Sequence, residues 1–142
     1  MGTPYQSDVI AWAREQAALL RSGKLSEIDA QNIAEEIEDV GKSEHRALAS
    51  HLSVLVAHLL KWKFQASHRG RSWRLTIDAQ RDEIAVLLSK APSLKQAFED
   101  EAWLRVVWKH AIASAQGEIK QDLPKSWIWS VGEVIDDGFW PD

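Results

Sequence analysis

Residues 29–65 read DAQNIAEEIEDVGKSEHRALASHLSVLVAHLLKWKFQ, and the spacing of the apolar residues in this stretch decides the fold. Apolar side chains recur in it as they do on one face of an α-helix. They are Ile33, Ile37, Val40, Leu48, Leu52, Leu55, Leu59 and Trp62. The helical spacing of these apolar residues is the same before and after Gly41. We therefore predict one continuous or mildly kinked helix from about Asp29 to Gln65, with a break at Gly41 as the alternative.

Helical patterns flank this stretch on both sides. Further helices are predicted over residues 7–22, 72–91 and 93–116, starting at Ser7, Ser72 and Ser93. The first of them places Ile10, Ala13, Ala17 and Leu20 on one face. Residues 121–142 are expected to form a strap with a short helical turn from Ser130 to Ile135, capped by Ser130 and Glu133. The sequence thus predicts an all-α, up-and-down helical bundle of about four main helices within residues 1–120, covered by the first helix and the strap in a single domain, 1–142.

The composition excludes several classes of protein. The 142 residues contain 45% hydrophobic and 27% charged side chains, which is typical of a globular chain. There is no cysteine, so disulfide frameworks, thiolate nucleophiles and zinc ribbons are excluded. The start of the chain lacks the basic and apolar regions of a secretory signal, and no apolar run is long enough to span a membrane. We expect a cytoplasmic protein.

A line of polar residues follows one core column of the long predicted helix. Glu44, His51 and His58 are spaced seven residues apart on it. If the following turn centres near Arg69, antiparallel pairing predicts a hydrogen bond between His58 and Gln80. Ligands of one metal on one helix are usually three or four residues apart, so we favour hydrogen-bonded polar groups in the core over a metal site. A metal-dependent enzyme with its site in the bundle core is the alternative.

Acidic residues gather in the first part of the long helix. Glu35 and Glu38 are helical neighbours, and so are Glu36 and Asp39. Such carboxylate pairs can hold a divalent ion, which makes a magnesium-dependent phosphohydrolase a second enzymatic alternative. It needs another carboxylate pair, and the best one, Asp78 with Asp82, is expected at the other end of the bundle. We favour a solvated acidic face instead.

Basic residues gather in the turn over residues 61–77, where Lys61, Arg69, Arg71 and Arg74 alternate with tryptophans. Arginines between aromatic rings suit single-stranded nucleic acid. The formal net charge of −4 argues against that use, because no basic surface extends beyond the turn. We therefore expect these cations, together with Glu35, Glu38 and Asp39, to contact a protein partner or to mediate self-association through complementary charged ends.

Six short runs in the chain resemble a known family. They are residues 12–20, 32–41, 58–62, 72–73, 80–81 and 92–95. Taken together they resemble the bacterial family known as domain of unknown function 29, and the resemblance covers most of the chain. It implies an all-helical fold and brings no assigned reaction, cofactor or catalytic residue. We predict a non-enzymatic protein-interaction or adaptor domain without a cofactor.

Overall fold

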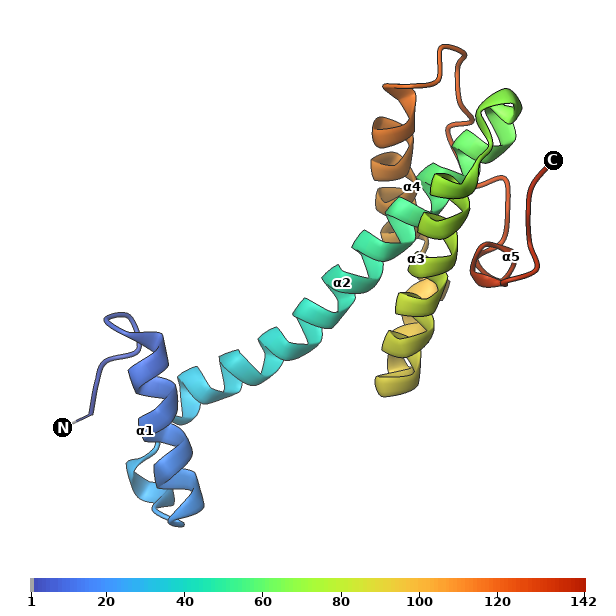
Figure 1. Ribbon diagram of the computed structural model, residues 1–142. Helices are drawn as coiled ribbons and strands as arrows, with labels where there is room; N and C mark the ends of the chain where they lie inside the picture. Colours follow the sequence, from blue (N-terminus) through green and yellow to red (C-terminus); the bar gives the residue numbers. More distant parts are fainter. Residues whose placement is uncertain (1) are drawn as a thin grey trace. The chain divides into compact units, whose positions relative to one another are not determined.

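The computed structural model describes residues 2–142, and all regular structure in them is helical (Figure 1). The helices are α1 (Val9–Arg21), α2 (Ala30–Phe64), α3 (Arg71–Lys90), α4 (Glu101–Gln116) and α5 (Val131–Ile135). Three short 3-10 segments join them: η1 (Leu25–Glu27), η2 (Ala66–His68) and η3 (Pro92–Glu99). No strand occurs in this part of the chain, so the predicted all-α fold is confirmed.

The chain forms two compact units, Met1–Ser43 and Glu44–Asp142. The first contains α1 and the beginning of α2, and the second contains the rest of α2 with every later element. By its contacts the first helix groups with the start of α2, and its expected covering of the bundle stays a prediction. The two units are described separately below, and the single domain stays a prediction.

The unit Glu44–Asp142 is a helical bundle whose long helices alternate in direction (Figure 1). Its core is formed by apolar side chains from α2, α3 and α4 that are almost completely buried, with Val134 of α5 among them. These include Leu48, Leu52, Leu55, Leu59, Ile77, Ile84, Val107, Trp108, Ala111 and Ala115. Four aromatic side chains of the strap, residues 121–142, pack against this core and remain partly exposed. The up-and-down bundle with a C-terminal strap is therefore present.

The unit Met1–Ser43 is a small helical hairpin held by a few polar contacts. The indole Nε1 of Trp12 donates to Asp29 Oδ2 at 3.0 Å, and Gln16 Oε1 accepts from the Asp29 backbone N at 2.7 Å. The Tyr5 hydroxyl donates to Glu36. This hydrogen bond to a carboxylate raises the pKa of Tyr5 to about 12.

The ends of α1 are set by specific caps. Its N-cap is Asp8, whose side chain accepts from the backbone N of Ile10 and Ala11, so the prediction of Ser7 was wrong by one residue. At the other end, Gly23 N bonds to Leu20 O at 3.1 Å and the following N bonds to Leu19 O at 2.9 Å. These are the two bonds of a Schellman motif, which needs a left-handed residue. Gly23 supplies it with φ of 71°.

The long helix α2 is continuous from Ala30 to Phe64 and passes Gly41 without a break, as the apolar spacing predicted. Asp29 caps it by accepting from Asn32. None of the helices within residues 2–142 combines the length with the apolar character that crossing a membrane requires.

Two predicted helix starts differ from the structure. α3 begins at Arg71 after the N-cap Gly70, not at Ser72. The predicted helix over residues 93–116 is broken at Asp100, because this residue caps a new helix: its Oδ1 accepts from the backbone N of Ala102 and Trp103. The residues before it wind as η3. The predicted helical turn at Ser130 is confirmed with both bonds of its capping box.

We predict that Gly41→Ala stabilises α2. A Cβ at Gly41 meets no atom within 4 Å, and alanine in a helix interior is favoured over glycine by about 0.5–1 kcal/mol. Amide hydrogen exchange around residue 41 should slow, and urea unfolding should show the added stability. Gly23→Ala is the matched control, because its positive φ makes the same change unfavourable. Faster exchange near residue 41 in Gly41→Ala would contradict an uninterrupted helix.

Candidate functional site

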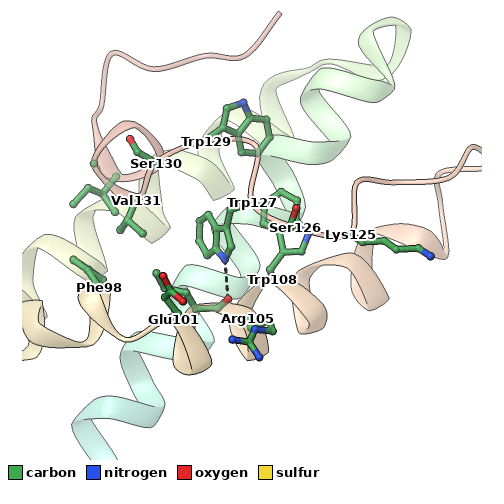
Figure 2. Close-up of a pocket in the computed structure, with 13 residues that line it drawn as sticks. Phe98, Glu101, Arg105, Trp108, Lys125, Ser126, Trp127, Trp129, Ser130 and Val131 are labelled. Carbon is green, nitrogen blue, oxygen red and sulfur yellow. Dashed lines mark hydrogen bonds between the residues drawn. The ribbon is translucent and has the colours of Figure 1, made fainter.

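An open cleft lies in the unit Glu44–Asp142, between the first half of α4 and the strap (Figure 2). Its volume is about 680 Å³. The lining residues come from η3, α4, the strap and α5: Phe98, Glu101, Leu104, Arg105, Trp108, Lys125, Ser126, Trp127, Trp129, Ser130, Val131, Gly132 and Ile135. Because aromatic rings form much of this lining, we call it the aromatic cleft.

Hydrogen bonds from two indoles hold the strap against α4. Trp108 is 1% exposed, and its Nε1 donates to Pro124 O at 2.9 Å. Trp127 Nε1 donates to Leu104 O at 2.8 Å, the bond drawn in Figure 2. The ring centroids of Trp108 and Trp127 are 5.2 Å apart. The polar edge of each indole is thus satisfied within the protein, which leaves the apolar ring of Trp127 as the middle of the cleft.

The other wall of the cleft is built by α5. Ser130 Oγ accepts from the Glu133 backbone N at 3.1 Å, and Glu133 Oε1 accepts from the Ser130 backbone N at 3.1 Å. This capping box fixes the start of the short helix and so places Val131 and Ile135 in the lining. Trp129 packs edge-on against Phe139 at 5.8 Å. The wall therefore depends on local caps and on aromatic contacts within the strap.

Charged and hydroxyl groups surround the apolar lining. Glu101 lies in the first turn of α4 and Arg105 one turn later, while Lys125 and Ser126 come from the strap. All four are exposed. Among residues 2–142, neither Arg105 nor Lys125 forms an ion pair, so both charges face solvent at the rim. The rim carries the positive charges of Arg105 and Lys125 against the one negative charge of Glu101, so the cleft can hold an apolar group and favours a negative one on the side of the cations.

A buried arginine anchors the strap to α3. Arg81 is 2% exposed, and its guanidinium donates to Val134 O at 3.0 Å, Phe139 O at 2.7 Å and Asp137 O at 3.5 Å. Burial lowers the pKa of Arg81. We assigned no role to this residue from the sequence. The available signal was its position between Ile77 and Ile84, which places a cation on the core face of the helix.

Most cations of the basic turn make contacts within the chain. Lys61 is buried, with Nζ 3.3 Å from Glu118 Oε1. Arg69 Nε donates to Trp62 O at 2.6 Å, and Arg69 Nη2 donates to Pro141 O at 3.2 Å. Arg74 lies over the rings of Trp62 and Trp140, at 5.6 and 4.9 Å. Binding of a partner by Lys61, Arg69 and Arg74 stays a prediction.

The remaining charged candidates lie apart from the cleft. Arg71 is exposed at the first position of α3. Glu35 and Glu38 are exposed on α2 in the other unit, and Asp39 lies 3.9 Å from Lys42. Their role as partner-binding residues also stays a prediction.

The polar line of α2 is paired differently from the prediction. His51, not His58, contacts Gln80, with Nδ1 2.7 Å from Oε1. His58 Nδ1 instead lies 2.9 Å from Val54 O in its own helix. The prediction assumed that the turn between the two helices has its midpoint at Arg69. The midpoint between His51 and Gln80 lies earlier in the chain, just after α2 ends at Phe64. The pairing register is therefore one heptad away from the expected one.

Glu44, the first residue of this polar line, is half-buried. Within residues 2–142, no group of three His, Asp or Glu side chains is arranged to hold a metal ion.

Comparison with known proteins identifies one family. The family model described as Domain of unknown function DUF29 matches residues 4–140. No curated protein and no solved structure matches the chain.

We predict that Arg81→Met destabilises the protein by about 3 kcal/mol or more, because it leaves the buried Val134 O and two partly buried carbonyl oxygens without this donor. Urea unfolding measures the loss, and limited proteolysis shows whether residues 121–142 become accessible. Arg71→Met is the matched control on the exposed surface of the same helix and should change stability by less than about 0.5 kcal/mol. Equal effects of the two variants would contradict the anchoring role of Arg81.

We also predict a loss of stability on acidification that depends on His58. Burial, aided by the charge of Lys61, lowers the pKa of His58 below its usual 6.5. The unfolded chain then binds a proton more readily than the folded one, so stability falls as the pH drops below about 6.5 and stops falling below the folded pKa. Urea unfolding of wild type and His58→Gln at about pH 7.5 and about pH 5.5 compares the two slopes. The variant should lose less stability, and the exposed His68→Gln should behave as wild type.

Proposed function

We propose that this chain, which belongs to the family described as Domain of unknown function DUF29, is a non-enzymatic protein-interaction domain that holds an apolar side chain of a partner in its aromatic cleft. The observation that carries this proposal is the cleft itself. It joins a half-exposed aromatic lining to a charged rim on the surface of a packed bundle. A cytoplasmic setting, expected from the lack of cysteine, belongs to the same proposal.

The size and lining of the cleft suit an inserted side chain. Its volume of about 680 Å³ lies within the range of about 300–1,000 Å³ that is usual for binding pockets. Phe98 and Trp127 are half-buried, so part of each apolar ring remains open to solvent. Aromatic rings lose little conformational freedom on binding and are enriched where interfaces concentrate their binding energy. An apolar side chain of the partner that displaces water from these rings is therefore expected to supply much of the binding free energy.

The rim indicates the chemistry of the partner next to that anchor. Arg105 and Lys125 carry the positive charges at the cleft, and the hydroxyl of Ser126 lies in the lining between the strap and α4. A carboxylate of the partner can pair with either cation while the neighbouring side chain enters the cleft. Charges at a rim mainly raise the association rate and the selectivity. We therefore propose a partner segment with a large apolar residue beside an aspartate or glutamate.

The other candidate functions have less support. Metal-dependent catalysis, magnesium-dependent phosphohydrolysis and nucleic-acid binding are each without a specific observation in their favour. The acidic residues Glu35 and Glu38 and the exposed Arg71 remain available to steer a charged partner. That contribution, and self-association through charged ends, stay predictions.

The test is a selection of random phage-displayed peptides on the immobilised full chain, followed by affinity measurement with a labelled selected peptide. Selected peptides should share a large apolar residue next to an acidic one. Val131→Lys places a charge in the lining and should weaken binding by about tenfold or more. Lys125→Glu changes an exposed rim residue and should also weaken binding, most strongly at low salt.

Val86→Lys is the matched control. Val86 is 55% exposed on α3, and the same substitution there should leave peptide affinity unchanged. The proposal is wrong if no peptide is selected. It is equally wrong if the selected peptides bind Val131→Lys and Lys125→Glu as tightly as wild type.

A further inference from the structure

The hairpin unit, Met1–Ser43, exposes a continuous apolar face. Large apolar side chains on it remain open to solvent: Ile10 is 63% exposed, Leu20 43%, Ile37 66% and Val40 64%. A groove of about 360 Å³ runs through this face, lined by α1 and the first part of α2. Both helices that form it belong to this unit. The sequence expectation that Ile10, Ala13, Ala17 and Leu20 share one helix face thus identifies a surface here rather than a core.

This hairpin buries few side chains of its own. Within the described part of residues 1–43, only Trp12 and Gln16 are buried, and only Trp12 is apolar. Folded units of about 40 residues usually need disulfides, a metal ion or oligomerisation. The chain has no cysteine, and residues 2–142 offer no group that would hold a metal. Oligomerisation is a means in that set that an exposed apolar face allows.

The exposed face combines small and large apolar side chains around one groove. Ala13 and Ala17, one turn apart on α1, form a low part of the groove. Ile37 and Val40 stand exposed on α2 beside it. A surface that carries both a hollow and the side chains to fill it can pair with its own copy around a two-fold axis. In that pairing α1 of one copy lies on α2 of the other.

Charged residues next to this face favour the pairing of α1 with α2 of the other copy. Arg14 and Arg21 follow Ala13 and Leu20 on α1, and Glu38 follows Ile37 on α2; all three charged residues are exposed. A pairing of α1 on the partner's α2 can bring Arg14 or Arg21, which lie two turns apart on α1, near Glu38 of the other copy. When α1 packs on the partner's α1, the arginines approach each other. Unlike charges across an interface fix its register, and like charges disfavour the alternative.

We propose that a second copy of this chain covers the apolar face of the hairpin, so that two copies of α1 and the beginning of α2 form a four-helix contact. This contact is separate from the aromatic cleft, which lies in the other unit. It uses apolar side chains as the main source of affinity and the charges only for register.

Sedimentation velocity of the full chain over a range of concentrations tests the contact. Wild type should show a dimer that dissociates on dilution. Val40→Lys should weaken dimerisation by about tenfold or more, because it places a charge in the groove lining that the second copy covers. Val86→Lys makes the same change at an exposed valine of the other unit and should leave the dimer intact. A wild type that is monomeric throughout, or a Val40→Lys variant that dimerises as well as wild type, overturns the proposal.

Charge reversal tests the pairing itself. Arg21→Glu should weaken the dimer by placing two acidic groups together, and combining it with Glu38→Arg should restore the wild-type affinity. The substituted positions are exposed, and both new residues are good helix formers, so folding should be retained. If the double variant is as weak as Arg21→Glu alone, or if Arg21→Glu strengthens the dimer, the arrangement of α1 on the partner's α2 is wrong.

Discussion

The donation of Arg81 to backbone carbonyls is the interaction on which the candidate site depends. A guanidinium that is 2% exposed has left water, and it retains its charge at low cost only because the strap supplies carbonyl oxygens at fixed positions. Those same contacts hold α5 and the residues after it on the bundle. The wall of the aromatic cleft that contains Val131 and Ile135 therefore rests, through Val134, on a residue of α3 that never touches the cleft.

Local rules in the sequence predicted much of the fold. The apolar spacing of α2 gave one helix through Gly41, and the spacing of Ser130 and Glu133 gave the capping box, because both features depend on residues close in the chain. The pairing of residues between helices was harder to predict. The bond from His51 to Gln80 depends on where α2 ends and how α3 returns beside it, which residue spacing alone does not determine. Asp100 shows a local competition, in which a good N-cap ended one helical segment and began another.

The candidate site was less accessible to prediction for a different reason. Its lining comes from η3, α4 and the strap, and these segments meet only after the chain has folded. Arg81 binds main-chain oxygens, which carry no sequence signature at all. The basic turn shows a further limit: the sequence places arginines and tryptophans close together there, but the contacts of Arg74 with Trp62 and Trp140 depend on where the strap docks. Interleaved cations and aromatics can equally be internal packing.

The distance along the chain between Arg81 and its acceptors bears on when the cleft comes into being. Its partners lie 53, 56 and 58 residues later, whereas most contacts within α3 are one turn apart. Closing so long a loop carries an entropic cost that is recovered only once the acceptors dock. During synthesis α3 is made before these acceptors, so the guanidinium of Arg81 stays hydrated until Val134, Asp137 and Phe139 have docked. The cleft is therefore incomplete until residues 134–139 have docked on α3, because the strap supplies one of its walls.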